Sequence, residues 1–303
     1  MSRRALTIEH RADCVAVSFF SMASPCEVLF DSRDERLVEQ LAAWLTQETW
    51  RIEDKFSRYQ SNNMMHQINN SKGETIDIDA ETARLLAFSD ACYQASEGMF
   101  DVTSGVLRKA WKFDGSGNVP NDDQVDALLP FVGWRKISFD QKNITLPLVG
   151  MELDFGGIGK EYAVDCVAQG LLKQLAVKQH SVPFLVNFGG DIFSSGSRLN
   201  GKPWVVAIDL KGLSNTEQKV LSIEKGGLAT SGDANRFLVK DGKRYTHILN
   251  PQTGWPIVEA PRSITVAAPT CIQAGMMCTI AMTKGKQAET FLKNNGLTYW
   301  IYE

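Results

Sequence analysis

Two glycine pairs, each at the end of an expected strand, are the feature of this sequence best suited to holding a phosphate group. The segments MELDFGG (151–157) and PFLVNFGGD (183–191) flank an expected helix over 159–173. Glycine permits positive φ and a close approach of the backbone to a ligand. Turns of this kind can offer N–H groups to an anion beside a helix N-terminus. The same pairs also suit ordinary tight turns, so both interpretations stay open at this point.

Several side chains are candidates for chemistry, and each has a structural alternative. Lys160 lies at the start of the expected helix, where the helix dipole disfavours a cation. It therefore points to an anionic partner unless it is simply solvated. His247 precedes an Asn-Pro-x-Thr-Gly turn and suits either catalysis or a structural role. Asp101 suits a cap on the helix that follows it, while Phe100 and Met22 suit either the core or a ligand contact.

Composition and charge narrow the class of protein. The 303 residues are 44% hydrophobic and 22% charged, which is ordinary for a globular protein, and they can bury a full core. A formal charge of −3 gives no general attraction to nucleic acid or to an anionic membrane. No apolar run reaches the length of a membrane-spanning helix. Charged residues at 9–13 interrupt the region where a signal peptide would be apolar, so we expect a cytoplasmic protein.

The six cysteines are scattered, with no C-x-x-C pair. In a cytoplasmic chain this pattern indicates buried thiols and disfavours structural zinc. The chain also lacks G-x-x-x-x-G-K-[ST], and its glycine pairs do not form G-x-G-x-x-G. An oxidoreductase with a conventional dinucleotide fingerprint is therefore disfavoured.

Periodicity predicts strands and helices that cluster separately more than they alternate, which favours the α+β class. Helices are expected over 33–56, 80–96, 122–130, 159–173, 271–283 and 285–294. Residues 113–121 are expected to form a loop. Strands are expected over 25–31, 135–139, 143–146, 151–155, 183–191, 203–208, 218–223, 227–231, 235–239, 262–268 and 297–302.

A series of separated segments resembles the FAD:protein FMN transferase (ApbE-like) family. SMASPCEVLF is similar to the family's Met-Gly-Thr strand, with Met22 matched and Ala23-Ser24 replacing Gly-Thr. The other segments occur in the family's order and extend the resemblance over about 22–282. They are FSRY followed by Asn69, GMFDVTSGVLRKAW, VGWRKI, LDFGGIGKEYAVD, NFGGDIFSSG, ATSGDANR, THILNPQTGWP and ITVAAPTCIQAGMMCTIAM.

The resemblance implies an α+β fold in which two interlocked subregions form a single FAD-binding domain over 1–303. It implies Mg²⁺-dependent transfer of FMN from FAD to a threonine hydroxyl of a partner flavoprotein, with release of AMP. Such phosphoryl chemistry needs positioning and charge neutralisation more than a protein nucleophile. The implied FAD contacts are Met22, Tyr59, Met99, Phe100, Asp101, Gly156, Lys160, His247 and Ile248, with His247 also the candidate catalytic residue. The implied metal ligands are the Gly159 carbonyl and Thr279.

One position departs from the family. The metal-binding segment of the family reads Ala-Asp-x-x-x-Thr, whereas this chain has Gly275 in place of the aspartate. The missing charge is worth about 4 kcal/mol at 4 Å in a medium of dielectric about 20, so we expect Gly275→Asp to strengthen Mg²⁺ binding. A protein that binds FAD without turning it over is the alternative function.

A second departure is Glu161, where the family has glycine in Lys-Gly-Tyr-Ala. Two hypotheses follow. Glu161 either projects into the site as a substitute metal ligand, or faces solvent.

Overall fold

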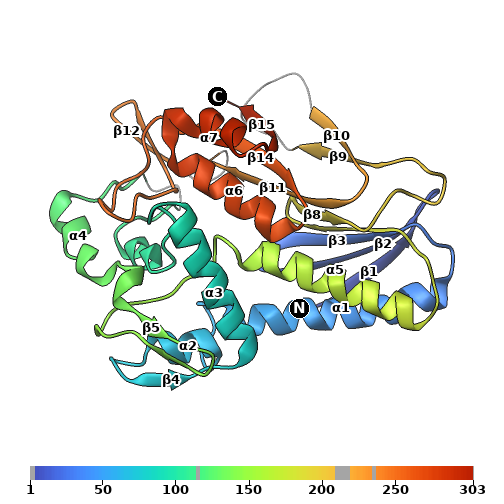
Figure 1. The fold of residues 1–303 in the computed structure, drawn as a ribbon, viewed down its shortest axis with the longest axis horizontal. Helices are drawn as coiled ribbons and strands as arrows, with labels where there is room; N and C mark the ends of the chain where they lie inside the picture. Colours follow the sequence, from blue (N-terminus) through green and yellow to red (C-terminus); the bar gives the residue numbers. More distant parts are fainter. Residues whose placement is uncertain (1–3, 114–116, 209–218, 234–236, 303) are drawn as a thin grey trace.

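An eight-stranded antiparallel sheet is the centre of the fold (Figure 1). The structure is a computed structural model and describes residues 4–113, 117–208, 219–233 and 237–302. Its neighbouring strands all pair antiparallel. In spatial order they are β1 (Leu6–His10), β2 (Val15–Ser21), β3 (Ser24–Phe30), β7 (Phe184–Phe188), β8 (Asp191–Ser194), β11 (Gly226–Gly232), β14 (Ser263–Ala268) and β15 (Thr298–Tyr302).

Three helices cover one face of this sheet: α1 (Glu35–Phe56), α5 (Gly159–Val177) and α6 (Cys271–Thr283). The hairpin of β9 (Trp204–Ile208) and β10 (Lys219–Ile223) packs on the opposite face, over Leu185, Ile192 and Leu228. Successive side chains of a strand point to opposite faces of the sheet. Alternate strand residues therefore pack into different hydrophobic clusters, one on each face.

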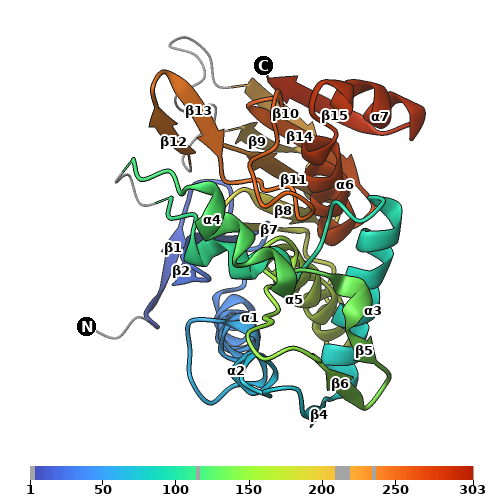
Figure 2. The same ribbon diagram turned by 90° about the vertical axis from the view of Figure 1, so that its left-hand side faces the viewer.

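The second subregion lies beside the C-terminal end of α1 (Figure 1). It contains α2 (Met64–Asn69), α3 (Ala80–Ala95) and a small sheet of β4 (Thr75–Asp77), β6 (Asn143–Thr145) and β5 (Ser138–Phe139). Its elements α2, β4 and β6 are at the bottom of Figure 2. The remaining elements are α4 (Asp122–Asp126), α7 (Ala288–Asn294), the hairpin of β12 (Phe237–Lys240) and β13 (Lys243–Thr246), and short 3₁₀ turns at Ser104–Lys109, Leu129–Phe131, Trp134–Lys136 and Gly285–Gln287.

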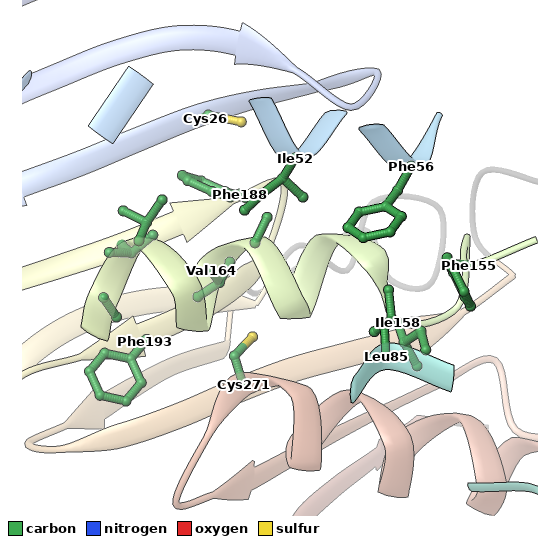
Figure 3. Close-up of a cluster of buried hydrophobic side chains, with 14 of the residues drawn as sticks. Cys26, Ile52, Phe56, Leu85, Phe155, Ile158, Val164, Phe188, Phe193 and Cys271 are labelled. Carbon is green, nitrogen blue, oxygen red and sulfur yellow. The ribbon is translucent and has the colours of Figure 1, made fainter. Parts of the chain in front are cut away.

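Helix α5 is buried between α1 and α6 in the main core. Figure 3 shows Ile52 and Phe56 of α1 on one side of it and Cys271 of α6 on the other. The same cluster contains Met65 and Ile144 of the second subregion, so one continuous core joins the two subregions. The α+β class predicted from the sequence is confirmed, and the single domain over 1–303 stays a prediction.

Most expected helices occur where predicted, including α6 over its full range. Helix α1 starts at Glu35 because the Asp34 side chain accepts a hydrogen bond from the Leu37 N–H at 3.0 Å. The expected helix over 122–130 ends earlier, at Asp126, and continues only as a 3₁₀ turn. The loop and strand predictions that include 114–116, 218 and 235–236 fall at those positions outside the described residues.

Two strand predictions were wrong in whole or in part. Residues 135–139 are divided between the 3₁₀ turn Trp134–Lys136 and the two-residue strand Ser138–Phe139. The strand expected over 183–191 is confirmed as β7, which ends at the Gly-Gly turn, and the next strand, β8, begins at Asp191. Residues 151–155 are not a strand, because the Asn69 side chain takes the place of a partner strand: its amide donates to the Leu153 carbonyl at 3.0 Å and accepts from the Leu153 N–H at 2.7 Å.

Strands β1 and β2 and helix α2 were not anticipated. All six cysteines are free, and all except the half-buried Cys166 are buried, which confirms the expectation of buried thiols.

The contact of α5 with α1 depends on Gly170. A β-carbon at this position would lie 1.9 Å from Cη2 of Trp44. Alanine favours a helix over glycine by about 1 kcal/mol, but overpacking a core costs about 1 to 3 kcal/mol. We predict that Gly170→Ala lowers the free energy of unfolding, measured by urea denaturation. Gly196→Ala is the matched control, since nothing lies within 4 Å of its added carbon. Equal stability of the two variants would contradict this packing.

Candidate functional site

The Gly189-Gly190 turn and the β2–β3 turn meet at one end of the large sheet, beside Lys160, which follows the Gly156-Gly157 turn in the chain. Gly189 and Gly190 connect β7 to β8 with φ of 62° and 100°. A β-carbon on Gly189 would lie 2.8 Å from the Ser24 side chain, so the two turns are in close contact. This junction is where the sequence predicted an anion site.

The β2–β3 turn is held in a left-handed conformation. Met22 and Ala23 have φ of 49° and 57°, as in a two-residue hairpin turn that glycine and asparagine favour. Glu53 of α1 stabilises it: one carboxylate oxygen accepts from the Met22 N–H at 2.7 Å and the other from the Ser21 hydroxyl at 2.9 Å. Met22 therefore has a fixed position at the junction despite the replacement of the family's glycine by Ala23.

Helix α5 begins at this junction, and its first residues carry opposite charges. The residue before the helix, Ile158, makes no side-chain cap. The Nζ of Lys160 lies 2.5 Å from Oδ2 of the buried Asp191, which follows the second glycine pair. The anionic partner that the position of Lys160 suggested is thus present in the chain. Sequence reasoning assigned no role to Asp191, although its place directly after Gly189-Gly190 was a signal.

Glu161 points into the protein rather than into solvent. Its Oε2 is buried and has no hydrogen-bond partner. Burial, together with the nearby Asp191 carboxylate, raises the pKa of Glu161 to about 8, against the opposing effect of Lys160. Burial likewise raises the pKa of Asp191. The structure therefore contradicts the hypothesis that the Glu161 side chain faces solvent.

The Glu161 side chain fills the space beside Gly275. A β-carbon at residue 275 would lie 2.7 Å from both Cγ and Oε1 of Glu161. The position of the family's aspartate is therefore filled by a side chain that an added residue would have to displace, and the effect of Gly275→Asp on Mg²⁺ binding stays a prediction. An added aspartate would displace Glu161 and bring two carboxylates together.

Asp165 fixes α6 against α5. Its two carboxylate oxygens accept from the N–H groups of Cys271 and Ile272 at 2.9 and 2.8 Å, at the first turn of α6. Gly275 and Thr279 follow along this helix, four residues apart and hence on one face. The Thr279 hydroxyl lies 3.1 Å from that of Ser231 on β11.

The other predicted contact residues have different surroundings. Phe100 is buried, and its ring would be 3.3 Å from a β-carbon on Gly157, while Met99 is half-buried. The Asp101 carboxylate is bound within the chain, because it accepts from the N–H and hydroxyl of Thr103 and from the Trp134 N–H. Asp101 thus has structural bonds, but it is not the helix cap stated as its alternative, because the 3₁₀ turn that follows has no side-chain cap.

Tyr59 and Gly156 are connected through Arg58. The Arg58 guanidinium donates to the hydroxyl of the exposed Tyr59 at 2.7 Å and forms an ion pair with Asp154. Asp154 in turn accepts from the Gly156 N–H at 2.9 Å. These residues border the first glycine turn.

His247 and Ile248 follow β13. The half-buried His247 ring lies edge-on to Phe113 at 6.2 Å between centroids, and Phe113 stacks on Trp111 at 5.9 Å. Ile248 packs against the cluster that includes Met277 and Cys278 of α6. The contacts thus place His247 beside an aromatic cluster and Ile248 beside the middle of α6.

A separate cavity of about 540 Å³ opens over α1 and α2. Two of its cations are already paired with carboxylates: Arg51 with Glu48 and Glu81, and Lys55 with Asp79 and Glu81. Although burial opposes it, hydrogen bonds from Arg51, Lys55 and Tyr162 lower the pKa of Glu81 to about 2. This network holds α5 to α1 and α3 and does not resemble a phosphate site.

Within the described ranges, no three or more His, Cys, Asp or Glu side chains are grouped to hold a metal ion. A cation at the α5–α6 contact would therefore depend on one carboxylate together with carbonyl and hydroxyl oxygens, which hard cations accept. No helix in the described part of the chain is long and apolar enough to cross a membrane.

The fold is that of the solved ApbE proteins. The model of the ApbE family matches residues 22–301, and the chain belongs to this family. It is 30% identical over 263 residues to the FAD:protein FMN transferase of Haemophilus influenzae, covering 82% of this chain and 75% of that protein. It is 27% identical to the Vibrio cholerae protein of the same name over 241 residues, with coverages of 78% and 71%.

Solved structures agree with this assignment. The ApbE protein of Thermotoga maritima superposes with a TM-score of 0.82 at 26% identity, covering 98% of this chain and 94% of that one. The apo form of the Pseudomonas stutzeri flavinyl transferase ApbE gives the same TM-score and identity, covering 98% and 91%. The resemblance inferred from the ordered segments is therefore confirmed.

Asp165 provides a test of how α6 is positioned. We predict that Asp165→Asn destabilises the protein by about 1 to 3 kcal/mol, because the amide replaces one of two buried charge-assisted acceptors. The measurement is urea denaturation at pH 7. Asp140→Asn is the control, since Asp140 accepts two backbone N–H groups at 2.7 and 2.8 Å on an exposed turn. A larger effect at residue 140 than at residue 165 would contradict the role given to Asp165.

Proposed function

We propose that this chain is an FAD:protein FMN transferase. It transfers the FMN part of FAD to a threonine hydroxyl on a partner flavoprotein and releases AMP. Family membership and the activity named for its relatives support the proposal. The single observation that carries it is the junction of both glycine turns with the uncapped start of α5 and Lys160. Such a junction offers backbone N–H groups and a cation to a pyrophosphate.

The reaction exchanges one phosphoester partner for another. The threonine oxygen bonds to the phosphorus on the FMN side, the bond from that phosphorus to the bridging oxygen breaks, and AMP leaves with that oxygen. The threonine proton must pass to a base, for which His247 is the candidate. The chain's task is to hold the two oxygens in line with phosphorus and to balance their charge.

The FAD contacts are proposed at Met22, Tyr59, Met99, Phe100, Gly156, Lys160, His247 and Ile248. Phe100 and Met22 offer apolar surface next to the glycine turns, and Lys160 offers charge. We propose an indirect role for Asp101: its hydrogen bonds to Thr103 and Trp134 fix the loop that carries Met99 and Phe100.

A divalent cation such as Mg²⁺ fits this site. The buried Oε2 of Glu161 lacks a hydrogen-bond partner, and oxygen ligands of the kind that Mg²⁺ prefers are available at Gly159 and Thr279. When bound, the cation would neutralise charge on the pyrophosphate. The non-catalytic alternative was based on the glycine at residue 275, which lacks a metal-binding carboxylate. The Glu161 carboxylate lies beside that glycine and supports the catalytic function instead.

The experiment is incubation of the purified chain with FAD, Mg²⁺ and a flavoprotein domain carrying an acceptor threonine. We predict release of AMP with a covalent mass gain of FMN on the acceptor. Lys160→Met should weaken FAD binding by about tenfold, the value of a partly screened charge contact. Lys173→Met, on the exposed face of the same helix, is the control. FAD binding without AMP release by the unaltered chain would contradict the transferase function.

A further inference from the structure

We propose that Glu161 supplies the carboxylate ligand for a divalent cation at the α5–α6 contact, and that residues 161 and 275 form a reciprocal pair of which only one can carry that carboxylate. In this chain the metal-binding carboxylate would therefore come from α5. In the family segment that residues 274–279 resemble, it comes from the aspartate at the position of Gly275, on α6. This inference rests on the proposed function for the identity of the ligand beside the cation.

The first observation is the state of the Glu161 carboxylate. Its Oε2 is buried and has no hydrogen-bond partner. Buried polar atoms are nearly always paired. An unpaired buried carboxyl oxygen therefore indicates a missing partner, and the partners of a carboxylate oxygen are hydrogen-bond donors and cations.

The second observation is charge balance around the group. Lys160 pairs with Asp191 at 2.5 Å and acts on Glu161 through its charge alone. Asp165 is satisfied by the two N–H groups at the start of α6. Oε2 of Glu161 has neither an ion pair nor a hydrogen bond, so we infer that a cation is the ligand that completes the cluster.

The third observation is the exclusion between residues 161 and 275. Any β-carbon at residue 275 would lie 2.7 Å from Cγ and Oε1 of Glu161. Glycine at residue 275 is therefore required for Glu161 to adopt this position. Thr279 follows Gly275 one turn later on the same face of α6, and Gly159 lies two residues before Glu161, so their hydroxyl and carbonyl are the further oxygen ligands that we propose.

The test measures Mn²⁺ binding by electron paramagnetic resonance and isothermal titration calorimetry, with and without FAD. Glu161→Gln should weaken Mn²⁺ binding by about tenfold or more, because a unit charge beside a divalent ion is lost. FAD binding without metal should be retained. The control is Glu74→Gln, which removes an exposed carboxylate far along the chain and should bind Mn²⁺ like the unaltered protein.

The reciprocal pair is tested by an exchange of residues. Gly275→Asp alone should lower the melting temperature and should not strengthen Mn²⁺ binding. The double variant Glu161→Gly with Gly275→Asp should recover both the melting temperature and most of the Mn²⁺ affinity lost in Glu161→Gly. Recovery would show that one carboxylate is needed and that either helix can present it. Additive losses in the double variant would overturn the reciprocal pair.

The outcomes separate this inference from the transferase function. Unchanged Mn²⁺ binding in Glu161→Gln, or no Mn²⁺ binding by the unaltered chain with or without FAD, overturns the role of Glu161 even if AMP is released. Loss of Mn²⁺ binding in Glu161→Gln without AMP release by the unaltered chain supports Glu161 and contradicts only the transferase function.

Discussion

The packing of the first turns of α5 against α6 determines where the charged groups of the site lie. Asp165 binds the N-terminus of α6 through two N–H groups, and Glu161, one turn earlier, fills the space beside Gly275. The apolar residues of α5 lie between α1, α6 and the sheet, so this helix cannot shift without disturbing the main core (Figure 3). A close-packed core thus holds a cluster of opposite charges in one arrangement.

The turns at the end of the sheet supply the other half of the site. The left-handed hairpin turn at Met22 is held by Glu53, and the Gly189 turn approaches Ser24 too closely for a side chain. A side chain thus holds the Met22 turn, whereas backbone geometry requires the glycine at residue 189. From the sequence alone, a phosphate-binding turn and a tight structural turn would look alike at such a glycine.

Much of this could be predicted from the sequence, because period and capping are local properties. Helix α6 was placed over its full range, and the family was inferred from motifs in the right order. The strand expected at 151–155 does not form, because the Asn69 side chain takes the place of a strand partner. The spacing of apolar residues along the sequence carries no information about such a contact. The role of Asp191 was missed because its contact with Lys160 joins residues that are remote in the chain.

The pair at residues 161 and 275 shows why a single substitution can mislead. Taken alone, Gly275 indicates loss of a metal ligand, and Glu161 indicates an unexplained acidic residue at a helix start. The structure brings them into contact, and the second residue then compensates the first. Their relation depends on the packing of two helices and could not be derived from spacing.

The measurement that tests the account most directly is a crystal structure with FAD and Mn²⁺, with the metal located by anomalous scattering. The account predicts one Mn²⁺ within about 2.5 Å of a Glu161 carboxylate oxygen, against the FAD pyrophosphate at the glycine turns. FAD bound elsewhere, or a metal that contacts the pyrophosphate while Glu161 stays unpaired, would contradict it.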